Sequence, residues 1–339
     1  MSDTLLEVEN LRTVFHTDKE TIRAVDGVSF DVQRGETVGL VGESGSGKSV
    51  TARSVLGLVE EPGVIEEGSI EFRGNELTDD SWDEHRGDIA IVFQDPMNSL
   101  NPVYTVGNQI KEALRIHQDL RGSDATEAAI ELLEDVGIPD AARRVSEYPH
   151  QFSGGMRQRA VIAIALACDP DLLVCDEPTT ALDVTIQAQI LELLDDLQRE
   201  EDLGVLFITH DMGVIEETTD RVNVMYAGEF VESAPVEELF DNPRHPYTRG
   251  LLASIPGRTA GGDRLPTIEG EVPTSTSKPS ECRFAPRCDH AFDACEEVHP
   301  ARIDVGEGTT DHEAACLLYD EKFDESPPGE AVAADGGGE

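Results

Sequence analysis

The stretch Gly42 to Ser49 has the sequence GESGSGKS, and it follows the apolar run Thr37 to Val41. The pattern G-x-x-x-x-G-K-S is that of a phosphate-binding P-loop, whose glycines let backbone N–H groups turn inward around phosphate oxygens. The apolar run predicts a buried strand, and the residues from Lys48 to about Leu58 predict a helix whose amino terminus favours an anion. A chance Gly/Ser-rich turn would lack this strand–loop–helix context, so we expect a nucleoside triphosphate to bind here.

The P-loop pattern assigns a role to its residues. Lys48 would reach the β- and γ-phosphates, and the Ser49 hydroxyl would ligate Mg²⁺. Backbone N–H groups of the loop and of the first helical turn would surround the phosphates. The residues expected to contact the nucleotide are Gly42, Glu43, Ser44, Gly45, Ser46, Gly47, Lys48, Ser49 and Val50.

A second apolar run, Leu172 to Cys175, ends in the acidic pair Asp176 and Glu177. A continuous apolar run of this kind is typical of a central parallel strand that is covered on both faces. Phosphoryl transfer depends on a metal ion and a positioned water, so we expect Asp176 to hold Mg²⁺, directly or through water, and Glu177 to act as the general base. The turn Pro178-Thr179-Thr180 distinguishes this pair from ordinary solvated acids at a strand end.

The run Phe152 to Arg159, FSGGMRQR, lies between these two nucleotide-binding signals. With it, residues 5 to about 240 resemble the ATP-binding cassette (ABC) family, in which such a run is the signature motif. Phe152 and Met156 depart from the commonest form of the signature, but Ser153 and both glycines remain. The further motif residues, in the order of the family, are Gln94 of the Q-loop, Ala181-Leu182-Asp183 of the D-loop and the switch histidine His210.

The resemblance implies that two ATPase domains pack head to tail, and that each ATP lies between the P-loop of one and the signature of the other. A Ser-Gly-Gly run at a helix amino terminus offers a hydroxyl, N–H groups and a positive dipole end to a phosphate. His210 would contact the same γ-phosphate, and Gln94 would sense it through Mg²⁺ and water. Phe15 would stack on adenine, or it is a plain core aromatic. The residues that the resemblance adds to the nucleotide site are Ser153, Gly154, Gly155, Asp183 and Phe15.

Two further segments resemble the oligopeptide/dipeptide importers, a group that includes nickel importers. They are Gln94 to Pro102, QDPMNSLNP, and Asn242 to Thr248, NPRHPYT. In these systems the ATPase subunit binds two integral membrane permeases, and an extracytoplasmic binding protein delivers the substrate. The resemblance therefore implies an ATPase that drives peptide uptake together with a second ATPase subunit, a paralogue rather than a copy of itself. Nickel or another small solute is the alternative substrate.

A function of another class is that of a soluble ABC ATPase acting on DNA or ribosomes. Such proteins usually carry two ATPase domains in one chain, or a long coiled coil dividing one. This chain has one P-loop, one signature and no heptad run. Its net charge of −43, from 69 Asp and Glu against 26 Lys and Arg, also disfavours a nucleic-acid surface. We therefore expect no nucleic-acid partner.

The alternation of apolar runs and helical segments predicts an α/β fold: a P-loop NTPase core with an antiparallel β subdomain, a helical insert and a small Cys-rich carboxy-terminal extension. Strands are predicted at Leu5–Val8, Val25–Val32, Thr37–Val41, Ile89–Phe93, Leu172–Cys175, Val205–Thr209 and Val222–Met225. We expect the ATPase domain over residues 1–255, with the helical insert at about 95–167. The extension would span residues 256–320, and a disordered acidic tail residues 321–339.

No apolar run approaches the ~20 residues that span a membrane. The amino-terminal sequence MSDTLLEVEN is acidic and has no signal-peptide apolar region. We therefore expect a cytoplasmic protein that lies at the inner face of the cell membrane through its partners.

Four late cysteines lie in the predicted extension: Cys282, Cys288, Cys295 and Cys316. A reducing cytosol disfavours disulfides, so thiols gathered in a Pro/Gly-rich segment suggest a metal site. The resemblance to the peptide importers implies a [4Fe–4S] cluster, with Zn²⁺ as the alternative and free thiols in a small capping fold as a third interpretation. The histidines close enough in sequence to compete as ligands are His290, His299 and His312.

The acidic residues are spread along the whole chain, which favours adaptation to a salt-rich cytosol, as in a halophile, over an ordinary acidic protein with an acidic tail. Self-repulsion at this charge density destabilises the compact state unless salt screens it. We therefore predict that the Tm rises markedly across a KCl series extending to molar concentration. A flat dependence of Tm on KCl would contradict the halophilic interpretation.

Overall fold

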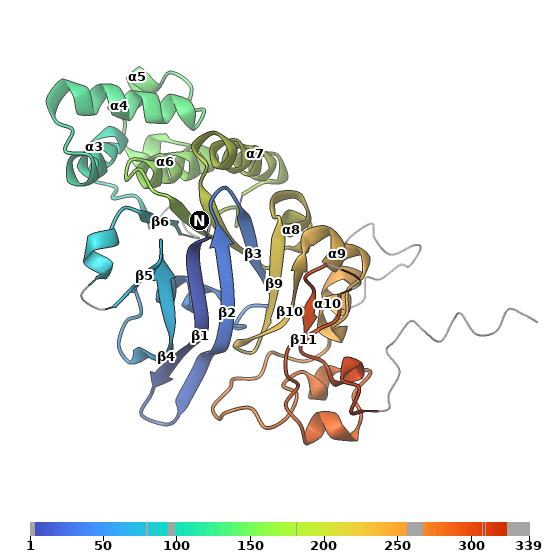
Figure 1. Ribbon diagram of the computed structural model, residues 1–339. Helices are drawn as coiled ribbons and strands as arrows, with labels where there is room; N and C mark the ends of the chain where they lie inside the picture. The colour runs from blue at the N-terminus through green and yellow to red at the C-terminus, as the bar shows by residue number, and fades with distance from the viewer. Residues whose placement is uncertain are drawn as a thin grey trace, which may run out of the picture.

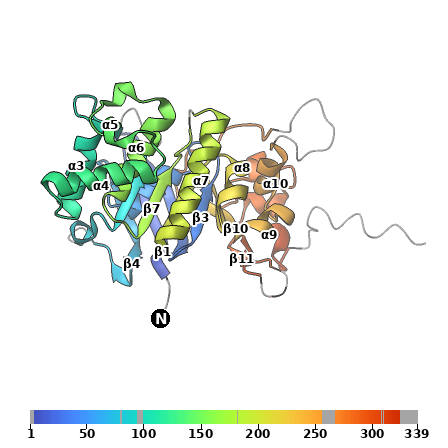
Figure 2. The same ribbon diagram turned by 90° about the horizontal axis from the view of Figure 1, so that it is seen from above.

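Two β-sheets face each other in the computed structural model, and helices cover the outer face of the second sheet (Figures 1 and 2). The structure describes residues 4–78, 81–93, 99–180, 182–255, 267–306, 308 and 310–323. The mixture of sheet and helix confirms the predicted α/β class.

The first sheet is antiparallel and has the strand order β2-β1-β4-β5. Its strands are β1 (Thr4–His16), β2 (Thr21–Gln33), β4 (Gly63–Phe72) and β5 (Asn75–Glu76). The predicted strands at Leu5–Val8 and Val25–Val32 are confirmed, although each is part of a longer strand. The antiparallel β subdomain is therefore present, with two strands that the sequence did not predict.

The second sheet has the strand order β11-β12-β10-β9-β3-β8-β7-β6. Its strands are β3 (Thr37–Val41), β6 (Ile89–Val92), β7 (Leu172–Asp176), β8 (Gly204–Thr209), β9 (Arg221–Tyr226), β10 (Glu229–Pro235), β11 (Ile303–Asp304) and β12 (Glu313–Ala314). Five neighbouring strands, β9, β3, β8, β7 and β6, run parallel. Strands β10, β12 and β11 add an antiparallel edge.

The parallel strands divide the interior into two cores. Successive side chains of a strand point to opposite faces, so a fully buried strand contributes to both. In β7, Leu172 and Val174 join the core that lies against the antiparallel sheet, whereas Leu173 and Cys175 join the core beneath the helices. This arrangement explains why the strand is a continuous apolar run rather than an alternating one.

The helices are α1 (Lys48–Val55), α3 (Val106–His117), α4 (Gly122–Asp135), α5 (Ala141–Arg144), α6 (Gly154–Leu166), α7 (Val184–Glu201), α8 (Met212–Thr218), α9 (Val236–Asp241) and α10 (Pro246–Ala253). Helix α1 packs between the two sheets, where Ala52 and Val55 are fully buried. Helices α3 to α6 gather at one end of the molecule, and the carboxy-terminal segments lie at the other (Figures 1 and 2). In the part of the chain that the structure describes, no helix is long and apolar enough to cross a membrane.

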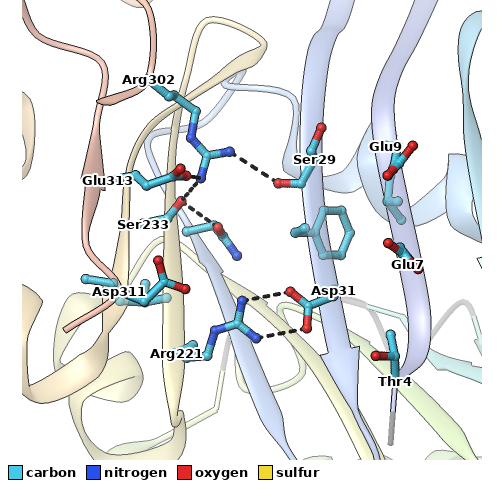
Figure 3. Close-up of a pocket in the computed structure, with 15 residues that line it drawn as sticks. Thr4, Glu7, Glu9, Ser29, Asp31, Arg221, Ser233, Arg302, Asp311 and Glu313 are labelled. Carbon is cyan, nitrogen blue, oxygen red and sulfur yellow. Dashed lines mark hydrogen bonds and ion pairs between the residues drawn. The ribbon is translucent and has the colours of Figure 1, made fainter. Parts of the chain in front are cut away.

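Arginines attach the carboxy-terminal segment to the two sheets. Arg283 pairs with the buried Asp26 of β2. Arg302 donates to the backbone carbonyl of Ser29 at 3.3 Å and to the hydroxyl of Ser233 at 3.1 Å, as Figure 3 shows. Because β12 also pairs with β10, this segment extends the central sheet.

Candidate nucleotide-binding site

The P-loop connects β3 to α1, as the sequence predicts, and its backbone passes very close to two strands. A Cβ atom at Gly42 would lie 2.2 Å from the carbonyl oxygen of Met225, and one at Gly47 would lie 2.3 Å from that of Ala24. Both glycines have a positive φ, 158° and 114°. Only glycine tolerates this combination, so the glycine pattern follows from the geometry of the loop.

Lys48 is buried, and its ammonium folds back over the loop. Its Nζ donates to the backbone carbonyls of Gly42 at 2.7 Å and of Glu43 at 3.0 Å. Burial lowers the pKa of Lys48, while the carboxylates of Glu177, Asp176 and Glu43 act in the opposite direction. The loop therefore holds a cation where the pattern requires one for phosphate.

Ser49 and Asp176 meet although 127 residues separate them in the chain. The Ser49 hydroxyl donates to Oδ1 of Asp176 at 3.0 Å, so two oxygens of the kind that Mg²⁺ prefers lie side by side. Burial, and then the neighbouring carboxylate of Glu177, raise the pKa of Asp176, while the bond from Ser49 opposes the shift. A cation at this position would relieve the charge that burial disfavours, so the pair fits a magnesium ion.

Glu177 and His210 come from adjacent parallel strands, whose carboxyl ends share one edge of the sheet. Glu177 has φ +50°, and its N–H donates to the carbonyl of Ile208 at 2.9 Å, which fixes this sparsely populated conformation. Its Oε1 lies 3.2 Å from Nδ1 of His210, and its Oε2 accepts from the Thr180 hydroxyl at 2.9 Å. The Glu177 side chain is 15% exposed and that of His210 is 58% exposed, so the histidine faces the open side of the site.

An open cavity of about 730 Å³ lies over these residues. The P-loop and the acidic strand ends contribute Glu43, Ser44, Glu177, Thr180 and His210 to its wall. The remaining wall consists of Leu251, Gly270, Glu271 and Val272. Sequence reasoning did not place this second group at the nucleotide site, because it carries no nucleotide-binding motif.

The signature lies apart from this cavity. Ser153 caps α6, its hydroxyl accepting from the Met156 N–H at 3.3 Å, and Ser153 and Gly154 are exposed. A Cβ atom at Gly155 would lie 2.5 Å from a methyl group of Ile186 in α7. Asp183 caps α7 and accepts from the Ile186 N–H at 3.1 Å. The described residues that line the cavity include none of Ser153, Gly154, Gly155 and Asp183.

Phe15, the candidate for adenine stacking, lies on β1. Its side chain is partly buried, and a Cβ atom at Gly63 of the paired strand β4 would lie 2.7 Å from the Phe15 ring. Gln94 and Ala181, predicted for the Q-loop and the D-loop, lie outside the described residues.

The predicted metal site at the late cysteines is not supported. Among the described residues, no group of three or more His, Cys, Asp or Glu side chains is arranged to hold a metal ion. Cys282 and Cys295 instead pack in a small apolar cluster with Leu317. Burial raises the pKa of Cys282 to about 11 and that of Cys316 to about 12, and the neighbouring late cysteines add to both shifts.

Two of the candidate histidine ligands, His312 and His299, have other partners. The side chain of His312 is fully buried, with Nε2 at 2.8 Å from a carboxylate oxygen of Glu232. His299 lies with Nδ1 at 3.3 Å from the carbonyl of Glu281.

Comparison with known proteins identifies the family. A family model described as ABC transporter matches residues 25–180, and one described as oligopeptide/dipeptide transporter, C-terminal region, matches residues 231–295. The chain is 51% identical over 324 residues to the oligopeptide transport ATP-binding protein AppD of Bacillus subtilis (strain 168), with 94% of this chain and 98% of the relative covered. The chain therefore belongs to the ABC transporter family, and it is an ATPase subunit of that family.

Solved structures agree with this assignment. The cbiO1 protein of Clostridium perfringens, part of the ABC transporter complex cbiONQ, matches with a TM-score of 0.62 and 27% identity, covering 71% of this chain and 92% of that one. A dimeric ATP-binding cassette in a post-hydrolysis state, bound to ADP and Pi, matches with a TM-score of 0.61 and 28% identity, covering 68% and 99%.

The position of Glu177 predicts the effect of one substitution. Glu177→Gln keeps the size of the side chain but removes its basicity, and a general base contributes about 10²–10⁴-fold in rate. We expect the kcat for ATP hydrolysis to fall by about that factor while MgATP binding persists, measured by phosphate release and by equilibrium binding.

Glu200→Gln, at an exposed position of α7, is the matched control and should hydrolyse ATP at the rate of the wild-type protein. A Glu177→Gln protein with an undiminished rate would refute the assignment of the base.

Proposed function

We propose that this chain energises the import of oligopeptides or dipeptides, hydrolysing ATP while bound to two membrane permeases at the inner face of the cell membrane. The observation that carries the proposal is the 51% identity, over 94% of the chain, to an oligopeptide transport ATP-binding protein. The match of residues 231–295 to the oligopeptide/dipeptide transporter C-terminal region supports the same substrate class. An extracytoplasmic binding protein would deliver the peptide to the permeases.

In the proposed site, each residue takes the role that its position suggests. Lys48 and the P-loop N–H groups would hold the phosphates, and Ser49 with Asp176 would hold the magnesium ion of MgATP. Glu177 removes a proton from the attacking water, and His210 contacts the γ-phosphate from the open side of the cavity. The Glu177–His210 contact of 3.2 Å supports this pairing of roles.

The proposed site is completed by a second ATPase subunit. Ser153 and Gly154 are exposed at the amino terminus of α6, where N–H groups and the helix dipole favour a phosphate. Because no described signature residue lines the cavity of its own chain, we infer that the signature serves ATP bound by the partner. A paralogue is the proposed partner. The proposed boundaries are residues 1–255 for the ATPase domain, 256–320 for the extension and 321–339 for the acidic tail.

A shared site predicts different effects for two substitutions in this chain. Ser153→Ala should leave MgATP binding by the chain's own P-loop unchanged, and should lower the ATPase rate of the assembled transporter. Lys48→Ala should abolish binding by the chain itself. Equilibrium binding to the full chain and phosphate release by the complex measure the two effects. A Ser153→Ala protein that binds MgATP as poorly as Lys48→Ala would show that the signature serves its own site.

The substrate class is tested with the complete transporter in liposomes. Adding its binding protein and a mixture of short peptides should stimulate ATP hydrolysis and lead to peptide accumulation inside the vesicles. The Glu177→Gln complex is the negative control. Stimulation by Ni²⁺ and not by peptides would instead support the alternative, a nickel or small-solute importer.

A further inference from the structure

Glu43 places a carboxylate inside the loop that is expected to hold a polyanion. Its backbone is part of the P-loop, where the carbonyl accepts from Lys48 at 3.0 Å, and its N–H donates to the hydroxyl of Tyr247 at 2.9 Å. A carboxylate near the phosphates repels them, and the repulsion is strongest where the site excludes water. A positive group beside the Glu43 carboxylate would offset this repulsion.

Arg287, from the carboxy-terminal extension, contacts that carboxylate with both arms of its guanidinium. The two N···O distances are 2.7 Å and 3.0 Å. The Arg287 side chain is only 6% exposed, and its guanidinium lies over the ring of Tyr226, 5.6 Å from the centroid. A bidentate pair with fixed geometry is stronger and more directional than a single ion pair. Arg287 thus fixes the Glu43 side chain across 244 residues of sequence.

The same guanidinium also holds one wall of the nucleotide cavity. It donates to the backbone carbonyls of Ile268 at 3.4 Å, Glu269 at 2.9 Å and Gly270 at 3.3 Å. The residues that follow directly, Glu271 and Val272, line the cavity together with Glu177 and His210. One buried side chain therefore connects the P-loop, the cavity wall and the extension.

We propose that Arg287 is a positioning residue for the nucleotide site: it neutralises Glu43, holds the P-loop in its phosphate-binding conformation, and makes ATP binding depend on the docked extension. This inference rests on the proposed nucleotide site at the P-loop. It assigns the carboxy-terminal extension a part in the ATPase cycle itself. An extension that is displaced from Glu43 would leave an unpaired carboxylate beside the phosphates.

Arg302 is a matched control that distinguishes the proposed role of Arg287 from a purely structural one. Arg302 also ties the extension to the core, through Ser29 and Ser233, in a different cleft (Figure 3). The hydrogen bonds of Arg302 described above reach no residue that lines the nucleotide cavity. If Arg287 acts only by anchoring the extension, Arg302→Ala should impair ATP binding in the same way.

The test measures MgATP binding to the full chain by titration calorimetry, in low and high KCl. We expect Arg287→Ala to weaken binding about 10-fold or more, because it leaves the Glu43 charge unpaired. The double variant Glu43→Gln/Arg287→Ala should recover most of the loss, and Arg302→Ala should bind as the wild-type protein does. Because salt screens charge repulsion, the Arg287→Ala defect should shrink as KCl rises.

If Arg287→Ala fails to fold, Arg287→Lys takes its place in the test. It keeps the charge without the bidentate geometry, so its affinity for MgATP should be lower than that of the wild-type protein. Wild-type affinity in Arg287→Ala, no recovery in the double variant, or an equal loss in Arg302→Ala would each overturn the proposal. Lys48→Ala distinguishes failure of the proposed nucleotide site from failure of the role proposed for Arg287. If Lys48→Ala binds normally, the proposed nucleotide site is wrong; if it abolishes binding while Arg287→Ala does not weaken it, only the role of Arg287 is wrong.

Discussion

The close approach of the P-loop backbone to two carbonyl oxygens is the constraint on which the site depends. Gly42 lies against Met225 of β9 in the central sheet, and Gly47 lies against Ala24 of β2 in the antiparallel sheet. The loop therefore sits where the two sheets meet, and α1 continues from it between them. A side chain at Gly42 would collide with β9 and one at Gly47 with β2, so phosphate binding and the packing of the fold share one geometric requirement.

Much of the site could be predicted from sequence because its residues follow apolar strands. Parallel strands place their carboxyl ends at one edge, so the residues after β7 and β8 had to lie near each other. Asp176, Glu177 and His210 accordingly converge, as the motif order predicts. The strand β4 was missed because its sequence, GVIEEGSIEF, combines glycines with charged residues and has no sustained apolar run. Only its pairing with β1 makes it a strand.

The extension could not be predicted from local patterns. Its cysteine spacing suggested a metal site, whereas the described residues include no group arranged to hold one, and Cys282 and Cys295 pack with Leu317. The contact of Arg287 with Glu43 likewise depends on how distant segments pack, since the P-loop pattern around Glu43 does not indicate a partner 244 residues away. Sequence periodicity reports which face of an element is buried, not which partner covers it.

In a chain with a net charge of −43, the few cationic side chains form ion pairs that connect separate segments of the fold. Arg221 links β9 to Asp31 of β2, and Arg283 links the extension to Asp26 of the same strand. Arg287 makes the corresponding link at the P-loop. Each of these arginines meets an acidic residue across a junction between segments that could otherwise repel one another. The extension is therefore held by ion pairs as well as by the buried ring of Phe284 and the pairing of β12 with β10. A nucleotide at the P-loop would add negative charge close to the Arg287–Glu43 pair.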